Sequence, residues 1–212
     1  MRALVLCDDH WHPAHTPRAG FAPLTDVGFT FDWIEDARAW SAARMADYPV
    51  VVLTKSNDIS AADRTAWMTP AVEEAFRAYV RAGGGLLAVH SGTADYRETP
   101  ILRALLGGVF VQHPPQCDVT IAPHGAHSLT VGLAPFTIRD EHYQMAFDAT
   151  DATRFLDTTS EHGVQPGGWT REEGAGRVCV LTPGHNVEVW LHPTYQALLG
   201  NALRWCGAGG QG

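Results

Sequence analysis

Short runs of apolar residues, separated by segments with helical spacing, constrain most strongly how this chain can fold. Three of these runs are uninterrupted: ALVLC (3–7), VVVLT (50–54) and LLAV (86–89). Apolar runs of this length without alternation are typical of strands buried on both faces of a parallel sheet. A fourth segment, FTFDWI (29–34), alternates in character and also predicts a strand.

Helical segments lie between and after these runs. In residues 70–82, apolar side chains recur every three or four positions, and Pro70 suits the first turn of a helix. We expect two further helices at residues 20–27 and 101–106, and a closing amphipathic helix at residues 193–206. Strands and helices in alternation predict an α/β fold whose parallel strands are joined by right-handed crossovers.

The second half of the chain has a different character. Its short segments rich in Thr and Val predict mixed or antiparallel strands added to one edge of the parallel sheet. These segments are CDVTIA (117–122), PFTIRDE (135–141), TRFLDT (153–158) and GRVCVLT (176–182). No linker or repeat divides the chain, so we expect one domain over residues 1–207 and a flexible tail over residues 208–212.

Composition and charge exclude several classes of function. The 212 residues carry a net charge of −8 with His neutral, which argues against a nucleic-acid-binding protein because such proteins present a basic face. No apolar run is long enough for a membrane span, and residues 3–7 are too short for a secretory signal. We therefore expect a cytoplasmic protein without membrane contact, with its four cysteines reduced because they have no paired spacing.

His90 occupies the most distinctive position in the sequence. The stretch GGGLLAVHSG (83–92) has the strand, tight turn and small residues of a nucleophile elbow, in which one strained residue projects over a sheet. Ser or Cys usually occupies this position, whereas histidine acts as a base or a metal ligand. The alternative is a histidine that ends a strand and bonds locally. Because these glycines precede a strand, they predict no NAD site.

Polar side chains follow four predicted strands at the points where these strands end. The segments are DDHWH (8–12), KSND (55–58), HSG (90–92) and PGH (183–185). Ligands of open parallel sheets bind beyond the carboxyl ends of the strands, so these segments predict one shared pocket.

Several motifs, taken together, resemble a known family. They are GGGLLAVHSG (83–92), LLGGVFVQHP (105–114), HSLTVGL (127–133), IRDEHYQM (138–145), WTREEGAGRVCVLTPGH (169–185) and HPTYQALLGNALRWC (192–206). In this order and spacing they resemble the ThuA-like, or trehalose-utilisation, family of the class I glutamine amidotransferase-like superfamily, over roughly residues 48–206. The resemblance implies a flavodoxin-like three-layer sandwich, with a mainly parallel central sheet and antiparallel edge strands.

The chain departs from the glutaminases of that superfamily at two positions. Those enzymes carry cysteine where this chain has His90, and a Glu two residues after the catalytic His. His185 resembles that His, but Val187 stands two positions on and Glu188 one further. Without a thiolate there is no thioester route, so the departures argue against glutamine hydrolysis.

The resemblance also implies which residues carry the chemistry. We expect the catalytic residues His90, His113, Glu141 and His185 to line the pocket. His90 or Glu141 would act as the base, with the other two histidines as acids or oxyanion partners. Imidazoles and a carboxylate also suit Zn²⁺ or a similar divalent transition metal, with His90, His113 and His185 as its ligands.

A sugar in this pocket would pack on indole faces and bond to polar side chains. We expect substrate contacts from Asp9, His10, Trp11, Asn57, Ser91, Tyr96 and Trp169. Trp11 and Trp169 would supply the apolar wall. His10, His12 and His15 are a second candidate group of metal ligands, with a solvated loop as the alternative.

Three functions remain open from the sequence. The first is an enzyme of carbohydrate metabolism that acts on trehalose-like or 3-keto sugar derivatives and is not a glutaminase. The second is a metal-dependent hydrolase that uses the same histidines, and the third is a non-catalytic sugar-binding module. Each takes a small sugar as its ligand, and a homodimer is compatible with the closing helix.

Overall fold

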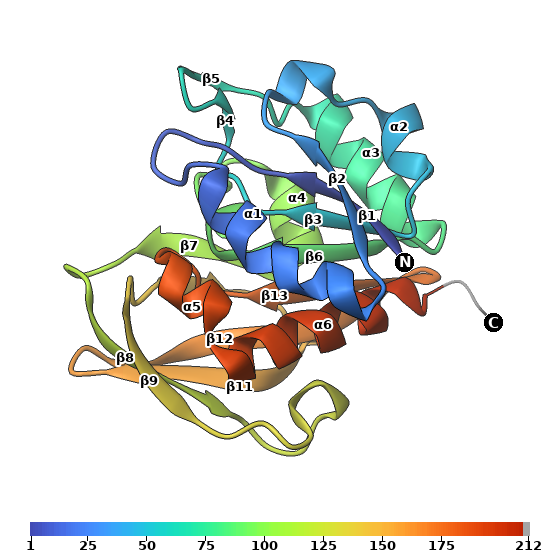
Figure 1. The fold of residues 1–212 in the computed structure, drawn as a ribbon. Helices are drawn as coiled ribbons and strands as arrows, with labels where there is room; N and C mark the ends of the chain where they lie inside the picture. Colours follow the sequence, from blue (N-terminus) through green and yellow to red (C-terminus); the bar gives the residue numbers. More distant parts are fainter. Residues whose placement is uncertain (210–212) are drawn as a thin grey trace.

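The computed structural model describes residues 1–209 and places a nine-stranded sheet at the centre of the molecule, in the order β2-β1-β3-β6-β13-β12-β11-β8-β9 (Figure 1). The parallel strands are β1 (Arg2–Leu6), β2 (Thr30–Ile34), β3 (Val50–Leu53), β6 (Gly85–Val89) and β13 (Gly176–Leu181). The antiparallel strands are β8 (Cys117–Pro123), β9 (Phe136–Asp140), β11 (Thr153–Ser160) and β12 (Gly163–Glu173). The predicted α/β fold, with a parallel core and antiparallel strands at one edge, is confirmed.

Helices cover both faces of the parallel half (Figure 1). They are α1 (His15–Phe21), α2 (Ala42–Ala46), α3 (Pro70–Arg81), α4 (Pro100–Leu106), α5 (Val187–Leu191) and α6 (Pro193–Gly207). Four 3₁₀ helices are η1 (Ala22–Val27), η2 (Ala37–Ala39), η3 (His90–Thr93) and η4 (Ser128–Thr130). Within β3, Val50 and Val52 face one core while Val51 and Leu53 face the other. Burial on both faces explains why the parallel strands are uninterrupted apolar runs.

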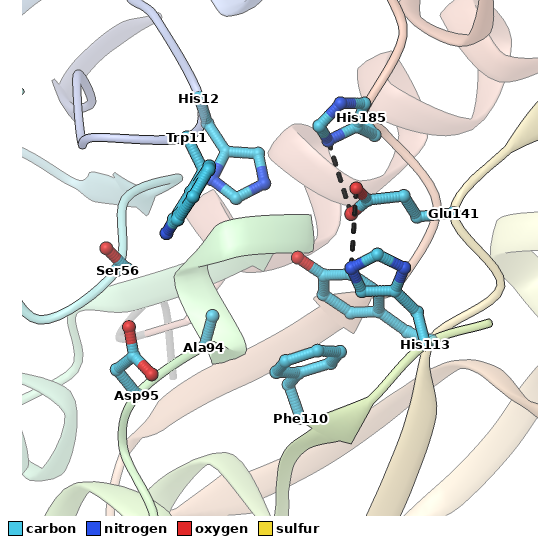
Figure 2. Close-up of a pocket in the computed structure, with 10 residues that line it drawn as sticks. Trp11, His12, Ser56, Ala94, Asp95, Phe110, His113, Glu141 and His185 are labelled. Carbon is cyan, nitrogen blue, oxygen red and sulfur yellow. Dashed lines mark ion pairs between the residues drawn. The ribbon is translucent and has the colours of Figure 1, made fainter. Parts of the chain in front are cut away.

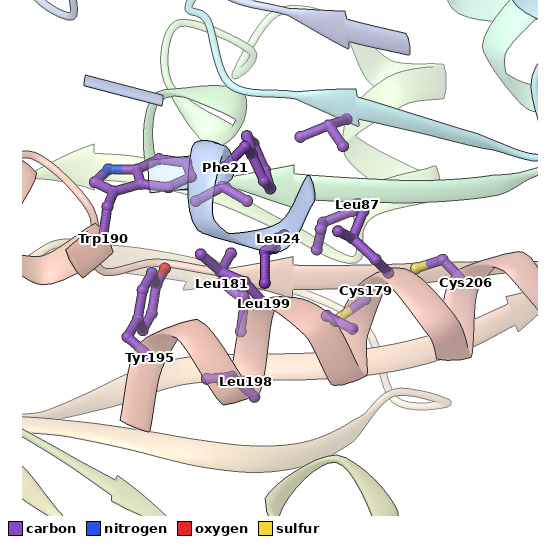
Figure 3. Close-up of a cluster of buried hydrophobic side chains, with 14 of the residues drawn as sticks. Phe21, Leu24, Leu87, Cys179, Leu181, Trp190, Tyr195, Leu198, Leu199 and Cys206 are labelled. Atoms are coloured by element: carbon purple, nitrogen blue, oxygen red, sulfur yellow. The ribbon is translucent and has the colours of Figure 1, made fainter. Parts of the chain in front are cut away.

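One of the two cores lies between the sheet and α6 (Figure 3). Leu198 and Leu199 of α6 pack there with Leu87 of β6 and Leu181 of β13, and all four side chains are buried. This packing fixes the two neighbouring strands whose carboxyl ends lead directly into His90 and His185.

Parts of the architecture differ from the sequence prediction. The helix expected at residues 20–27 is instead the end of α1 followed by η1. The strand β12 was missed because Pro166, Gly167 and Gly168 interrupt its pattern, next to register shifts in its pairing with β11. GRVCVLT forms β13, which belongs to the parallel half on one side and pairs with antiparallel β12 on the other.

Two small antiparallel pairs were also not predicted. They are β4 (Asp58–Ser60) with β5 (Asp63–Ala66), and β7 (Gly108–Gln112) with β10 (Gln144–Phe147). The second pair matters for the site because it brings residue 113, just after β7, close to residue 143, just before β10.

No helix within residues 1–209 is long and apolar enough to cross a membrane. The helix α6 ends at Gly207, and the tail predicted at residues 208–212 lies outside the described residues from residue 210 onward.

Candidate metal centre

His90 opens the tight turn η3 directly after β6 and has a positive φ of 47°. A residue other than glycine is strained at positive φ, and this strain persists only where the surrounding structure imposes it. Gly92 makes the turn sterically feasible, because a Cβ at this position would lie 1.9 Å from the carbonyl oxygen of Leu53. His90 therefore projects from a strained elbow, as its sequence context indicates.

The tautomer of His90 follows from its hydrogen bond. Its Nδ1 lies 2.8 Å from the carbonyl oxygen of Thr182, and because a carbonyl only accepts, Nδ1 carries the hydrogen. The Nε2 lone pair is therefore free, and burial lowers the pKa of His90 and favours this neutral form. Tyr143 stacks on the imidazole with ring centroids 4.0 Å apart, which fixes the ring orientation.

His12 is positioned by a buried carboxylate, that of Asp9. The Oδ1 of Asp9 accepts from the backbone N–H of Trp11 and of His12, each at 2.9 Å, and lies 2.8 Å from His12 Nδ1. Although burial raises the pKa of Asp9, the contacts with His12 and the backbone hydrogen bonds from Ser56 and Trp11 together outweigh burial, and the pKa is lowered. An ionised Asp9 holds the hydrogen on Nδ1 of His12 and leaves Nε2 as the free nitrogen.

His185 is positioned from the antiparallel half of the sheet. The last residue of β9, Asp140, is fully buried and accepts from the backbone N–H groups of Gly184 and His185, at 2.8 and 2.9 Å. Asn186 donates a third N–H at 3.3 Å. This carboxylate therefore fixes the loop after β13 against the end of β9, where Glu141 follows.

Glu141 lies between the histidines. Its Oε2 is 3.4 Å from His90 Nε2 and 3.2 Å from His185 Nδ1, and its Oε1 is 3.5 Å from His113 Nε2. Burial raises the pKa of Glu141, but His185 and His90 together outweigh burial and hold the pKa well below its usual range. Glu141 in turn raises the pKa of His185. The group thus combines a carboxylate with a neutral His90 and with His185, whose protonated form the carboxylate favours.

Four ligand atoms converge in this group, since one atom each from His12, His90, Glu141 and His185 lies within 4.8 Å of the other three. Within residues 1–209, the nitrogens His12 Nε2, His90 Nε2 and His185 Nδ1 are buried and have no hydrogen-bond partner. The contacts of His90 and His185 with Glu141 are close but lack hydrogen-bond geometry. Three imidazole nitrogens and one carboxylate oxygen suit a divalent first-row metal such as Zn²⁺ or Mn²⁺. Hydrogen bonds to Asp9 and Thr182 orient the rings of His12 and His90 through their second nitrogens, an arrangement common in metal sites.

A cavity of about 320 Å³ opens onto this group (Figure 2). Its lining consists of Trp11, His12, Ser56, Ala94, Asp95, Phe110, His113, Glu141, Tyr143 and His185. The size and the mixture of aromatic and polar side chains are typical of a small-molecule site.

The structure brings together part of the predicted site. His90, Glu141 and His185 converge, and His113 lies in the cavity beside Glu141 but outside the four-atom group, where His12 takes the place predicted for it. Of the predicted substrate contacts, Trp11 lines the cavity, and Asp9 lies behind His12.

Other predicted substrate contacts lie elsewhere. Asn57 accepts from the backbone N–H of Trp67 and Met68 and so joins the two ends of the β4–β5 hairpin. Tyr96 and Trp169 are fully buried and donate to the carbonyl groups of Lys55 and Leu106. These three side chains are absent from the cavity lining, and each is held in place by internal hydrogen bonds.

Two further predicted contacts, His10 and Ser91, are also outside the cavity lining. His10 is exposed and packs edge-on against Trp11, with ring centroids 4.6 Å apart. The hydroxyl of Ser91 is buried without a partner.

Sequence reasoning missed several lining residues. They are Ala94, Asp95, Phe110 and Tyr143, while Ser56 belongs to the KSND segment of the predicted pocket but was not singled out as a contact. Phe110 and Tyr143 lie in the LLGGVFVQHP and IRDEHYQM motifs, although only the β7–β10 pair brings them to the cavity. Asp95 carried no such signal, because its position depends on the turn after η3.

The comparisons with known proteins agree with this architecture. The family model for ThuA, described as trehalose utilisation, matches residues 2–206. A ThuA-like protein from Bacteroides uniformis superposes with a TM-score of 0.78 at 24% identity, covering 97% of this chain and 91% of that protein. A ThuA-like protein from Parabacteroides merdae gives a TM-score of 0.79 at 16% identity, covering 98% and 90%. A cytoplasmic protein from Salmonella typhimurium gives 0.68 at 14% identity, covering 97% and 99%. No curated protein matches the chain.

Proposed function

Because the chain belongs to the ThuA, or trehalose-utilisation, family, we propose that it is a metal-dependent enzyme of sugar metabolism. The ion would be held by His12, His90, Glu141 and His185. We further propose that it works in the cytoplasm, as one structural relative is described as a cytoplasmic protein. The cavity beside the four ligands supports this proposal, since it leaves room for a substrate next to the ion.

The observation that carries the proposal is the convergence of three unpartnered imidazole nitrogens in the protein interior. Each buried polar atom without a hydrogen bond costs roughly 1–3 kcal/mol. Three such atoms at one point would be a large cost for a structure that needs only acid–base groups. A divalent ion satisfies all three at once, and Glu141 supplies a negative charge beside it.

Residues of the cavity supply the proton transfers. A bound divalent ion would act as a Lewis acid toward a carbonyl or hydroxyl oxygen of the sugar. His113 donates Nδ1–H to the carbonyl of Pro114 at 2.8 Å, so its Nε2 is the atom that takes up or releases a proton. Oε1 of Glu141 lies 3.5 Å from this nitrogen and stabilises the imidazolium.

The reaction class that these groups suit is proton transfer at the carbon next to a sugar carbonyl, as in a 3-keto derivative, leading to isomerisation or elimination. The four cysteines are free thiols and none lies in the cavity lining, so no thiol is placed for glutamine hydrolysis within the described residues.

Elemental analysis of untagged protein after dialysis against Zn²⁺ or Mn²⁺ tests the proposal. We expect about one equivalent of metal in the wild type and in His113→Ala, and a loss of metal in His12→Ala and His90→Ala. His162→Ala, an exposed histidine, is the matched control. Wild-type protein that retains no metal, or ligand variants that retain it fully, would overturn the proposal.

Turnover of a 3-keto disaccharide separates the roles of the two kinds of histidine. Chelation should abolish turnover in the wild type. His113→Ala should lose turnover while it keeps its metal, because His113 transfers protons and does not hold the ion. Full turnover in this variant would remove His113 from the mechanism.

A further inference from the structure

The cavity has a second wall, on the opposite side from Glu141 and His185 (Figure 2). It is built by Trp11, Ser56 and Asp95. These residues come from the segments after β1, after β3 and after η3, so the wall uses three separate loops of the parallel half. The metal ligands leave these side chains unused.

Ser56 offers a buried hydroxyl with no protein partner. The residue is 1% exposed, and its backbone N–H donates to Asp9 at 2.8 Å, which fixes its position. Its Oγ is buried and forms no hydrogen bond to the described residues, and Ser56 belongs to the cavity lining. A buried hydroxyl without a partner is rare in native proteins, and a ligand hydroxyl would satisfy it.

Asp95 presents a carboxylate to the same cavity from a strained backbone. Its φ is 61°, a conformation in which a residue other than glycine is strained. Burial and the nearby carboxylates of Asp58 and Asp9 raise the pKa of Asp95. The residue is exposed and lines the cavity, and a carboxylate there can accept from two neighbouring hydroxyl groups.

Trp11 adds an apolar face at the cavity mouth. Its side chain is 60% exposed, while His10 packs edge-on against it and the guanidinium of Arg64 lies 5.7 Å from the ring centroid. These contacts hold the indole beside Ser56 and Asp95. An indole face next to hydroxyl-binding groups is suited to a ring that carries hydroxyls at its rim and C–H groups on its face.

The charged side chains that line the cavity disfavour an anionic ligand, while Arg64 and Arg97 lie near Asp95 but outside the lining. The lining contains the carboxylates of Asp95 and Glu141 and no Lys or Arg. Lys55, which lies nearby in sequence, donates to the carbonyl groups of Asp8, Glu35 and Ile59 and is not available. A divalent ion at the metal centre would already be balanced by the two carboxylates of the cavity.

We propose that Asp95, Ser56 and Trp11 form a hydroxyl-binding wall that selects an uncharged, polyhydroxylated sugar ring over its phosphorylated counterpart. The two carboxylate oxygens of Asp95 accept from adjacent hydroxyls, Ser56 bonds to a third, and Trp11 covers the ring face. This inference rests on the proposed function for the metal side of the cavity, but the wall itself can be tested separately.

Binding measured by isothermal titration calorimetry, with metal-loaded protein, tests the wall. The probes are trehalose, maltose and sucrose, with trehalose 6-phosphate as the anionic counterpart. We expect at least one neutral disaccharide to bind, and Asp95→Asn and Ser56→Ala each to weaken it about tenfold, since each removes a buried or charged hydrogen bond. Asn tolerates the left-handed conformation of residue 95, so Asp95→Asn changes the charge while it preserves the turn.

Controls separate this result from a general disturbance. Asp95→Gly relieves the backbone strain but removes the carboxylate, and should weaken binding as Asp95→Asn does. Glu98→Gln removes a neighbouring carboxylate that borders only the adjoining cavity, and should bind as the wild type. The metal content of every variant should equal that of the wild type.

Three results would overturn the wall: no neutral disaccharide binds, Asp95→Asn binds as tightly as the wild type, or trehalose 6-phosphate binds more tightly than trehalose. Sugar binding that depends on Asp95 in a protein without metal would reject the proposed function alone. If the protein retains its metal but the Asp95 variants bind sugar as tightly as the wild type, the wall alone would be rejected.

Discussion

The two halves of the central sheet contribute to the site in different ways. The parallel half supplies three of the four side chains of the candidate metal centre from loops that follow its strands: His12 after β1, His90 after β6 and His185 after β13. The antiparallel half supplies Glu141 at the end of β9 and, one residue earlier, the buried Asp140. The parallel half therefore carries most of the chemical groups, while the antiparallel half fixes the geometry and supplies the negative charge.

Removing the connection between the two halves should have the largest effect. In Asp140→Asn, an NH₂ group replaces one of the two carboxylate oxygens, both of which accept from backbone N–H groups. Because the site is fully buried, the NH₂ group and the N–H that has lost its acceptor then face each other without a hydrogen bond. We expect the free energy of unfolding to fall by about 4 kcal/mol and the metal to be bound more weakly.

Denaturant unfolding and metal titration measure these two effects. Asp118→Asn, an exposed carboxylate on β8, is the control and should change neither quantity. A stability of Asp140→Asn close to that of the wild type would show that the parallel half holds His185 without help from β9.

A change at the elbow tests the parallel half alone. In Gly92→Ala, the new Cβ would collide with the carbonyl oxygen of Leu53. Because the Cβ is fixed to its Cα and the oxygen belongs to the backbone, neither can rotate away and the turn must shift. We expect a loss of about 3 kcal/mol in unfolding free energy, with displacement of His90 and reduced metal content.

Ser91→Ala is the matched control for the elbow, in the adjacent position of the same turn. The hydroxyl of Ser91 is buried without a partner, so its removal should be neutral or slightly stabilising. If both variants unfold like the wild type, the turn is not as tightly packed against β3 as these distances indicate.

The smallest effect on metal binding is expected at Asp9, which orients His12. Asp9→Asn keeps the shape of the side chain that holds His12 but removes its charge and can reverse its hydrogen bond to Nδ1. We expect the metal to bind roughly tenfold more weakly, with little change in fold, as is usual for groups that orient a ligand histidine. Competition with a chromogenic chelator measures this, and an affinity equal to that of the wild type would assign Asp9 a purely structural role.

Much of the fold could be predicted from the sequence because its signals are local. The runs at residues 50–54 and 86–89 became the central strands β3 and β6, and the helix predicted at residues 70–82 became α3 at Pro70–Arg81. The strand β12 escaped prediction because its Pro and Gly residues are tolerated only through the irregular pairing with β11.

The candidate site was predictable in part, for a related reason. His90, His185 and Glu141 stand at or next to strand ends, so the rule that ligands bind at the carboxyl ends of parallel strands placed two of them, and the resemblance placed the third. The sequence analysis predicted that Trp169 stacks on a sugar ring, but its indole N–H donates to the carbonyl oxygen of Leu106 inside the core. Composition cannot distinguish a buried indole from an exposed one.

The sequence by itself determined the parallel α/β core, because uninterrupted apolar runs can be buried only with helices on both faces of a sheet. It also predicted an elbow at His90, because Gly92 and the preceding apolar strand are neighbours of His90 in the chain, whereas the strained φ of His90 is shown only by the structure. Only the tertiary structure decided that His12 rather than His113 completes the four-atom group, and that Ser56 and Asp95 face it across a cavity. These residues are far apart in sequence. Strand order and loop hydrogen bonds bring them together, and the ring tautomers decide which nitrogens are free, none of which a local sequence pattern encodes.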